Sequence, residues 1–328
     1  PIVAGAVVTG ASFGDKLSPL SDSTNLAAAT AQAGLFDHVR HMLKTTIPSF
    51  LIALIIYGII STTLDANAGD PEAINKLTTV IDANFKISPI IFIPPVIIIL
   101  MIGLKVPPVP GMLVGVIAGI AMCFYQGADV GTILTTIYSG PTIETKNEVV
   151  DKLLARGGLL FMMETISLVI CALSFGGAIK AIGAVDTIIE TILKHVRRRG
   201  SIIATNVVMS IFCNFAAADQ YMSIVIPGQM YKKVYKQLNM APENLSRTLE
   251  DAGTLTSGLV PWSTCGAVYL ATLNVSAFAY GRYHLIGIIN PIIAIVYAYA
   301  GIFLNPLDKS KPIKTRLTDE DIVEMDKA

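Results

Sequence analysis

Long apolar runs, separated by short charged stretches, are the clearest pattern along this chain. A helix needs about 20 apolar residues to cross a hydrocarbon core roughly 30 Å thick, and a membrane β-barrel would instead alternate polar and apolar positions. The pattern therefore predicts an all-α membrane protein, a multi-spanning helix bundle. The predicted spans are residues 46–64, 88–104, 106–125, 157–179, 253–281 and 285–304.

Composition agrees with this pattern and excludes several classes of protein. The 328 residues are 53% hydrophobic and 15% charged, and the mean hydropathy is +0.62, so lipid solvates the chain better than water. The formal net charge is zero, and no basic field indicates a nucleic-acid partner. The four cysteines lie in apolar segments without a CxxC pair, so neither a zinc site nor a disulfide framework is expected. No motif for an organic cofactor is present.

Charge is distributed unevenly between the predicted spans. The basic clusters lie at 194–199, 232–236 and 309–316, and the acidic stretches at 65–86 and 129–156. Because cytoplasmic loops are rich in Lys and Arg, the basic clusters are expected inside the cell and the acidic stretches outside. In this membrane topology residues 201–237 form a helical hairpin that begins and ends inside the cell, and the carboxy terminus is cytoplasmic.

The same membrane topology predicts how the chain is divided into repeats and a tail. We expect residues 1–328 to form one transporter domain, with the end of a first repeat and the following spans in 1–126. A second repeat occupies 157–304, and 305–328 form a cytoplasmic tail. The chain opens at Pro1 within an apolar run and without a signal peptide, which indicates the carboxy-terminal portion of a longer protein.

A first polar break, residues 13–24, interrupts an apolar stretch of helical length. Proline removes a backbone donor and glycine adds flexibility, so the helix is expected to unwind here. Opened carbonyls, hydroxyls and carboxylates are the oxygen ligands that a hard cation prefers, and Lys16 is placed to pair with one of the acids. A plain loop between two helices is the alternative. The candidate cation and proton ligands are Asp15, Ser18, Ser21, Asp22 and Thr24.

A second break, residues 254–264, is also rich in hydroxyl groups and contains glycine and proline. At a fixed offset it matches the first break at five positions, and the predicted topology sends the two segments across the membrane in opposite directions. Paired broken helices in opposed halves indicate the midplane site of a transporter built from inverted repeats. The candidate ligands here are Thr254, Thr256, Ser257 and Ser263. Glu250 and Asp251 are interpreted as acids near a helix start and left out of the site.

A third break, residues 214–220, falls at the turn of the predicted hairpin. It contributes Asn214 and Asp219, and an ionisable residue at membrane depth is a functional candidate. The alternative is structural, because Asp is a favoured helix N-cap. We expect a sodium ion to be held chiefly by Asp22 and Asp219.

Three strings carry a resemblance to a known family: GASFGDKLSPLSDST (10–24), NFAAADQYMSIVIPG (214–228) and SRTLEDAGTLTSGLVPWSTCG (246–266). The chain resembles the NhaC family of bacterial sodium/proton antiporters over nearly its whole length. The resemblance implies a multi-pass carrier of the bacterial cytoplasmic membrane with inverted repeats, broken helices and helical hairpins, whose substrates are sodium and protons. It also implies a homodimer. The family includes exchangers that couple sodium and protons to malate and lactate.

Sodium/proton exchange through shared carboxylates is therefore the favoured function, with Asp15 supporting Asp22 and Asp219. An organic-acid exchanger is the alternative; no arginine falls within a predicted span to pair with a dicarboxylate, which favours cation-only exchange. Catalysis is not expected. Residues 10–14 match the GxSxG pattern of serine hydrolases, but that pattern requires a strand-turn-helix and a histidine base. The four histidines, His38, His41, His195 and His284, fall outside the predicted spans.

Overall fold

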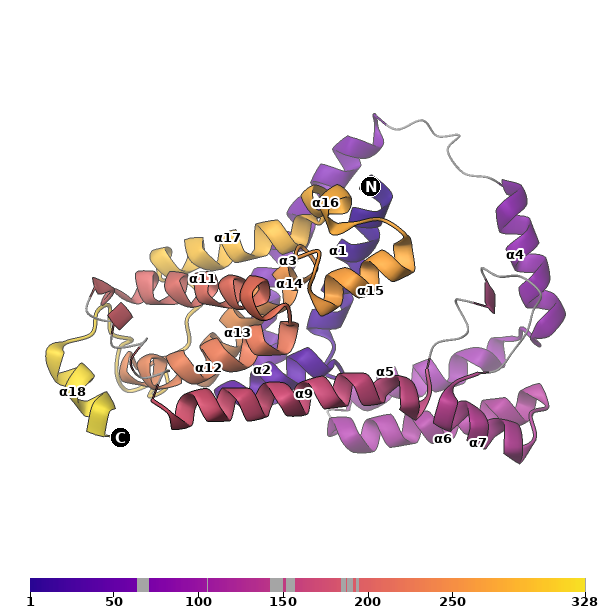
Figure 1. The fold of residues 1–328 in the computed structure, drawn as a ribbon, viewed down its shortest axis with the longest axis horizontal. Helices are drawn as coiled ribbons and strands as arrows, with labels where there is room; N and C mark the ends of the chain where they lie inside the picture. The colour runs from indigo at the N-terminus through magenta and orange to yellow at the C-terminus, as the bar shows by residue number, and fades with distance from the viewer. Residues whose placement is uncertain are drawn as a thin grey trace. The chain divides into compact units, whose positions relative to one another are not determined.

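A computed structural model describes residues 1–63, 71–104, 106–141, 150–151, 157–183, 187, 191–192 and 195–327. The named elements of this part of the chain are all helices (Figure 1), as expected for an all-α protein. Parts of the acidic stretches predicted to lie outside the cell, residues 65–70, 142–149 and 152–156, fall outside the described residues.

The chain divides into two compact units. The first unit contains residues 1–62 and 171–328, and the second contains residues 63–170. The division falls inside one long helix, α9 (Gly158–Ala181). The second unit otherwise contains α4 (Pro71–Asn84), η1 (Pro89–Phe92), α5 (Ile93–Gly103), α6 (Pro108–Gln126) and α7 (Val130–Ser139).

All three polar breaks lie in the first unit and interrupt helices there. The first break separates α1 (Ile2–Leu17) from α2 (Asp22–Ala31), and α3 (Leu35–Ser61) follows. The hairpin consists of α11 (Arg199–Ala217) and α12 (Gln220–Gln237). The second break follows α13 (Pro242–Leu249), the π-helical turn η2 (Glu250–Thr254) and α14 (Leu255–Ser257), and ends at α15 (Thr264–Leu273). The remaining elements are α16 (Ala277–Tyr280), η3 (Gly281–Tyr283), α17 (Leu285–Ala300) and α18 (Asp319–Lys327).

Several helices have the length and composition of membrane spans. Among the described residues three qualify alone, Leu35–Ser61, Val109–Gln126 and Arg199–Ala217, and two bent pairs raise the number to five if each pair is one span. On α3 the side chains of Leu51, Ile55 and Ile59 are 53%, 64% and 64% exposed. An apolar stripe at four-residue spacing suits a lipid-facing surface. The prediction of a multi-spanning helical membrane protein is confirmed.

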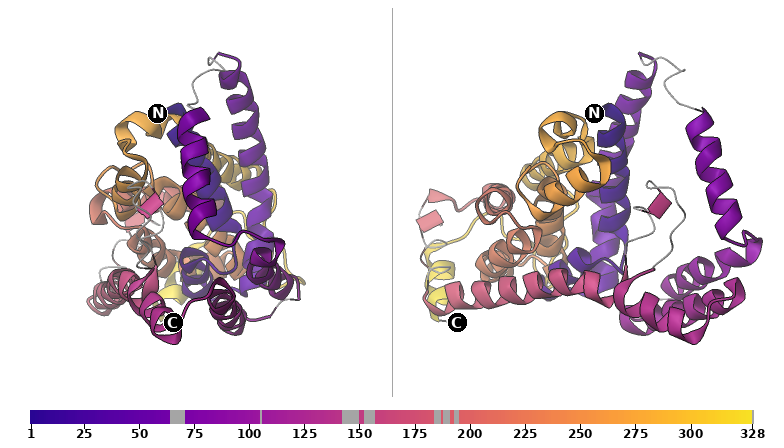
Figure 2. Two further views of the ribbon diagram at one scale, coloured as in Figure 1. Left: turned by 90° about the vertical axis from the view of Figure 1, so that its right-hand side faces the viewer. Right: turned by 45° about the vertical axis from the view of Figure 1, so that its right-hand side comes forward.

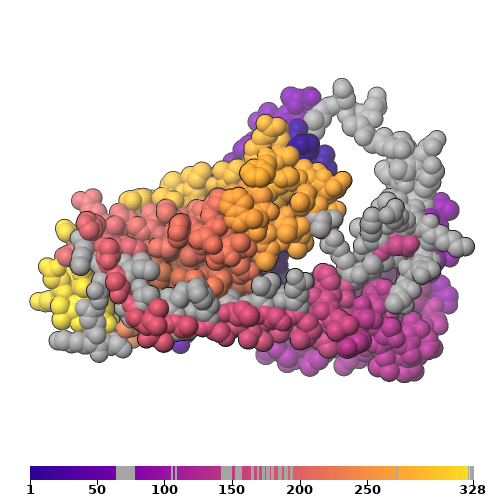
Figure 3. All heavy atoms as spheres, viewed as in Figure 1, coloured from indigo at the N-terminus to yellow at the C-terminus, as the bar shows by residue number. Residues whose placement is uncertain are grey.

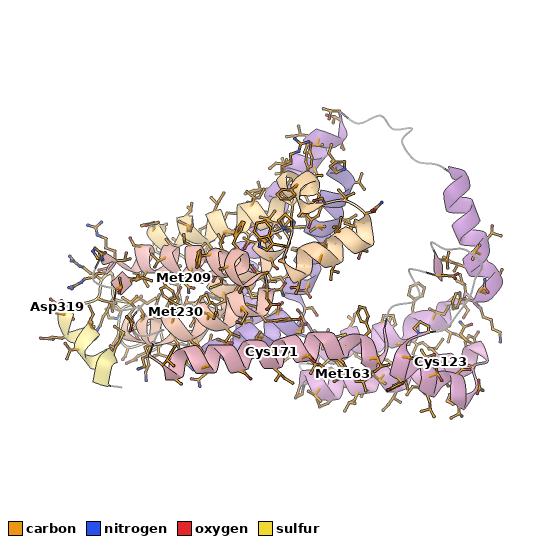
Figure 4. All side chains as sticks on the ribbon, in the orientation of Figure 1. Cys123, Met163, Cys171, Met209, Met230 and Asp319 are labelled. Atoms are coloured by element: carbon orange, nitrogen blue, oxygen red, sulfur yellow. The ribbon has the colours of Figure 1, made fainter. Side chains whose placement is uncertain are left out.

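The hairpin lies at the centre of the first unit. Helices α11 and α12 pack against each other, α11 contacts α17, and α12 contacts α2 and α13, as the two views of Figure 2 and Figure 1 show. Met209 on α11 and Met230 on α12 lie on these neighbouring helices (Figure 4). The buried core around them includes Ile202, Ile224, Tyr231 and Leu249. This core fixes the position of the hairpin turn, where α11 ends and α12 begins.

The carboxy-terminal tail is attached to the same unit. Leu317 and Met325 join the core beside the hairpin, and in Figure 3 the tail (yellow) lies beside the hairpin. Arg197 binds Asp319, labelled in Figure 4, with 2.5 Å between Nη1 and Oδ1. Thr318 and Asp321 exchange the reciprocal hydrogen bonds of a capping box at the start of α18. The tail is therefore a folded part of the first unit.

One predicted boundary is wrong. The span expected at 46–64 belongs to a helix that begins at Leu35. Its first turns carry polar side chains such as His38 and His41, but both of these are buried. Hydropathy alone cannot detect this extension, because burial against α2 and α13 replaces the lipid contact that an apolar run requires.

Candidate functional site

The first break is short and is closed by hydrogen bonds of its own side chains. Only residues 18–21 leave the helical conformation, so Asp15 lies in the last turn of α1 and Asp22 begins α2. The hydroxyl of Ser18 accepts from the backbone N–H of Leu20 at 3.2 Å, and Thr24 donates to the carbonyl of Lys16 at 3.0 Å. Ser18 and Thr24 therefore hold the break together, and Asp15 and Asp22 remain exposed.

Ser23 connects the two carboxylates of the first break through its hydroxyl and its backbone N–H. Ser23 donates to Oδ2 of Asp15 at 3.4 Å, and its hydroxyl lies 3.1 Å from that of Ser21. The backbone N–H of Ser23 donates to Oδ1 of Asp22 at 2.7 Å. Ser23 was not among the predicted ligands, although it lies within the run of hydroxyls. Asp15, Ser21 and Asp22 therefore form one polar cluster.

A tyrosine of the hairpin reaches this cluster. The phenol of Tyr221, two residues after Asp219, donates to Oδ2 of Asp22 at 2.6 Å. The hydrogen bond joins residues 199 positions apart in the sequence and brings the hairpin turn against the first break. Sequence reasoning missed Tyr221, because the pattern of a single helix gives no sign of which side chain will meet another segment.

Asp219 caps α12, as the structural alternative predicted. Its Oδ1 accepts from the backbone N–H groups of Tyr221 at 2.9 Å and of Met222 at 3.1 Å, while Ala218 turns the chain with a φ of 57°. Its other oxygen, Oδ2, lies 3.4 Å from the hydroxyl of Thr264 at the end of the second break. Capping leaves this second oxygen free for a weak contact, so Asp219 can both cap the helix and face the break.

The second break is joined to the hairpin by more hydrogen bonds. The amide of Asn214 donates to the carbonyl of Gly253 at 2.6 Å and to the hydroxyl of Thr256 at 2.9 Å. Ser263 caps α15 by accepting from the N–H of Gly266 at 3.0 Å, which is a structural role. The hydroxyls of Thr254 and Ser257 are buried without a hydrogen-bond partner among the described residues. These two are the predicted ligands of this break that remain available.

A buried ion pair links the first break to η2, the turn that leads into the second break, and it joins residues that were not paired from the sequence. Nζ of Lys16 contacts Oδ1 of Asp251, and both side chains are 0% exposed. The same oxygen accepts from Thr45 at 2.9 Å and from the amide of Asn290 at 2.7 Å. Asp251 is fully buried in η2, which continues α13, so its interpretation as an acid near a helix start is wrong. Asn290 was visible in the sequence as a polar residue inside the apolar run 285–304.

Two further charged side chains are buried around this pair. Arg247 is 1% exposed, with Nη1 donating to the carbonyl of Phe303 at 2.7 Å and Nε 3.8 Å from Oδ2 of Asp251. Glu250 is 0% exposed, and neither of its oxygens has a hydrogen-bond partner among the described residues. Arg247 is thus a buried arginine outside the predicted spans, and its guanidinium is already held by protein groups.

The histidines also differ from the prediction. His38 and His41 lie within α3 and are 0% and 2% exposed, and His284 is 0% exposed. Residues 10–14 are helical throughout, so the strand-turn-helix that a GxSxG nucleophile requires does not form there. Among the described residues no three His, Cys, Asp or Glu side chains gather to hold a metal ion. Hydroxyls and carbonyls can ligate sodium as well, so the pairing of Asp22 with Asp219 as sodium ligands stays a prediction.

Comparisons with known proteins cover most of the chain. The model of the Na+/H+ antiporter family matches residues 10–302. The Na+/H+ antiporter NhaC of Alkalihalophilus pseudofirmus is 41% identical over 92% of this chain and 65% of its own length. NhaC of Bacillus subtilis is 35% identical over 90% of this chain and 66% of its own length. The malate-2H+/Na+-lactate antiporter of Bacillus subtilis is 33% identical over 93% of this chain and 65% of its own length.

This chain therefore spans slightly less than two thirds of the length of these relatives. No solved structure matches it.

Proposed function

Because the chain belongs to the Na+/H+ antiporter family, we propose that the protein exchanges sodium for protons across the bacterial cytoplasmic membrane. It acts as a multi-pass carrier, with its basic tail in the cytoplasm. The sites of exchange are the carboxylates of Asp22 and Asp219, supported by Asp15. Sodium and protons compete for these groups, so that a proton leaves when sodium binds.

The observation that supports this proposal most directly is the hydrogen bond from Tyr221 to Asp22 at 2.6 Å. It joins the turn of the hairpin to the first break, and the contact of Thr264 with Asp219 joins the second break to the same turn. Three polar interruptions of apolar helices thus meet at one place. Broken helices that converge in this way supply the opened backbone and oxygen ligands that secondary transporters use for coupling ions.

The oxygen ligands are divided between structural and available groups. Ser18, Thr24, Asn214, Thr256 and Ser263 make hydrogen bonds that hold the breaks in place. Ser21, Thr254 and Ser257 are buried, and we propose that they complete the coordination of sodium. Alternating access then requires one repeat, within 1–126 or 157–304, to move against the other.

Organic-acid exchange is the competing function, since one relative is a malate/lactate antiporter. The buried guanidinium of Arg247 is the group that a dicarboxylate would need. It already contacts Asp251 and the carbonyl of Phe303, which favours exchange of cations alone.

The test is proton flux in proteoliposomes that hold the complete protein and an internal pH dye. Sodium alone should drive proton movement, and Asp22→Asn or Asp219→Asn should abolish it. Asp37→Asn, which alters an exposed carboxylate of the same unit, is the matched control and should exchange normally. Flux that appears only when malate or lactate is added with sodium would replace this proposal with organic-acid exchange. Normal exchange by both Asp22→Asn and Asp219→Asn would show that these carboxylates are not the site.

A further inference from the structure

Two arginines lie side by side where the carboxy-terminal tail meets the start of α11. Arg198 and Arg316 form an isolated antiparallel β-bridge, and beside it the backbone N–H of Arg199 donates to the carbonyl of Thr315 at 2.9 Å. Residues directly opposite each other in an antiparallel pair have Cβ atoms about 4.5–5.5 Å apart, and like charges at such positions are unfavourable. The backbone therefore holds two positive charges close together.

No acid of the described residues neutralises this pair. Arg197, the neighbour of Arg198, binds Asp319, but neither Arg198 nor Arg316 makes a salt bridge within the part of the chain that the structure describes. Both side chains are exposed. The tail supplies half of the pair, because Arg316 precedes Leu317, which is 1% exposed and belongs to the core beside the hairpin. Packing of the tail thus brings two like charges together without a counter-charge.

Arg199 adds a third positive charge next to this pair. A Cβ atom at Gly301 would clash with Nη2 of Arg199, so the guanidinium lies against the residue that follows the last turn of α17. Its Nε is buried and has no hydrogen-bond partner among the described residues. The planar fork of a guanidinium matches a phosphate group, which it binds through two parallel hydrogen bonds. Three arginines without an acid therefore favour a phosphate-containing anion as their partner.

Apolar surface begins directly beside the arginines. The hydroxyls of Ser201 on α11 and Tyr299 on α17 lie 3.3 Å apart, and the two helices pack against each other (Figure 1). Spacings of three, four and seven residues keep side chains on one face of a helix. Counted in this way from Ser201 and Tyr299, the apolar side chains on the same two faces are Val208, Phe212, Ile292 and Val296, which are 56–62% exposed. Two apolar stripes thus run along the helices from the end that carries the arginines.

We propose that Arg198 and Arg316, together with Arg199, bind the phosphate of an anionic phospholipid whose acyl chains lie along α11 and α17. Charge complementarity identifies this occupant, because the arginines attract a phosphodiester and repel the amine of a zwitterionic headgroup. Helix α11 has the length and composition of a membrane span, so lipid covers its apolar stripe. Basic pockets at the ends of membrane helices bind anionic headgroups in this way.

The bound lipid joins the tail to the helix bundle. One phosphate that contacts both arginines offsets the repulsion across the bridge, and it thereby stabilises the packing of the tail on α11. The site lies at the start of α11, whereas the hairpin turn with Asp219 follows the last residue of that helix. Lipid binding is therefore separate from the carboxylates and does not depend on the proposed sodium/proton exchange.

The test is a titration of the purified complete protein in non-ionic detergent with phosphatidylglycerol, in which native mass spectrometry counts the bound lipid. The wild type should bind phosphatidylglycerol in preference to phosphatidylcholine. Arg198→Gln/Arg316→Gln should weaken the affinity for phosphatidylglycerol about 25-fold, since each basic side chain near an anionic headgroup contributes about fivefold. Lys309→Gln/Lys311→Gln removes the same charge from exposed positions of the same tail and should bind like the wild type.

Three results would overturn the proposal. Equal binding of phosphatidylcholine and phosphatidylglycerol by the wild type would mean that apolar contacts alone hold the lipid. Displacement of the lipid by excess inorganic phosphate would assign the arginines to a soluble anion. Wild-type affinity for phosphatidylglycerol in Arg198→Gln/Arg316→Gln would exclude these side chains from the site.

Thermal melting keeps the test independent of damage to the fold. Without anionic lipid the double glutamine variant should melt no lower than the wild type, because it removes the repulsion between like charges across the bridge. Phosphatidylglycerol should raise the melting midpoint of the wild type and of the lysine control, but not that of the glutamine variant. An equal rise in all three proteins would contradict the proposal. If the double variant does not fold, Arg316→Gln alone replaces it, with an expected loss of affinity of about fivefold.

Discussion

Gly228 allows a close approach between α12, which follows Asp219, and α2, which begins at Asp22. A Cβ atom at this position would lie 2.4 Å from Cγ2 of Thr30 and 3.0 Å from Cδ1 of Leu249. Carbon atoms in contact are normally about 3.5–4.0 Å apart, and a β-branched side chain such as Thr30 has little freedom to rotate away. We therefore expect Gly228→Ala to push the two helices apart.

The cost can be worked from these distances. Overpacking costs about 1–3 kcal/mol, and a contact as short as 2.4 Å belongs near the upper end of that range. Replacing glycine by alanine inside a helix stabilises the folded protein by about 0.5–1 kcal/mol. The net loss is then roughly 2 kcal/mol, which corresponds to a melting midpoint lower by about 4–8 °C at about 2–4 °C per kcal/mol.

Circular dichroism of the purified protein in detergent, followed during heating, measures this change. Thr30→Ser removes Cγ2, so the double variant Gly228→Ala/Thr30→Ser should recover most of the lost stability. Gly10→Ala is the matched control, because a Cβ atom there meets nothing within 4 Å, and it should melt no lower than the wild type. A Gly228→Ala protein that melts with the wild type would refute the close packing of α12 on α2. A destabilised variant that Thr30→Ser does not rescue would refute the contact with Thr30.

Two further predictions concern the second break and the tail. Trp262, the single tryptophan of the chain, lies in the second break and donates from Nε1 to the carbonyl of Phe215 at 3.0 Å. Sodium should therefore change its fluorescence, while choline should not. An unchanged signal at saturating sodium would show that the second break is not part of the sodium site. In the tail, burial opposes ionisation of Asp321, but hydrogen bonds from Lys314 and Thr318 outweigh it and lower the pKa of Asp321 below its ordinary value. The ionised carboxylate therefore stabilises the folded tail at pH values above its ordinary pKa of 3.8. This stabilisation is lost as the pH falls through the lower pKa of the folded state. Asp321→Asn should therefore increase tryptic cleavage after Lys314 at neutral pH, because charge-assisted hydrogen bonds worth about 1.5–3 kcal/mol are weakened; unchanged cleavage would contradict this role of Asp321.

The positions of the broken helices could be predicted because their cause is local. Proline, glycine and clustered hydroxyls interrupt helices through the backbone of the same segment, and the interruptions at residues 18–21 and after Ser257 lie where those residues predicted them. The hairpin turn at Ala218 and Asp219 lies within the third predicted break, which was recognised instead from its polar residues between two basic clusters. The relation between inverted repeats, which rests on five matched positions, stays a prediction.

The identity of the charged partners could not be predicted, because it depends on which helix faces which. Lys16 was expected to pair with an acid of its own break, yet it contacts Asp251, 235 residues away. Asp251 and Arg247 appear in the sequence as polar residues at the edge of an apolar run, where exposure to water is the ordinary expectation. Packing of α13 and η2 against α2 and α3 removes that water and turns edge residues into buried ones.

Sequence alone thus determined the all-helical membrane class, the three polar breaks and the family resemblance, since each depends on hydropathy, backbone chemistry or motifs within a short segment. Tertiary structure alone decided that Tyr221 reaches Asp22, that Asp219 caps a helix while its second oxygen faces Thr264, and that Lys16 lies on Asp251. The physical reason is that a buried charge must find its partner wherever the packed helices bring one, and no periodicity within one segment specifies that place.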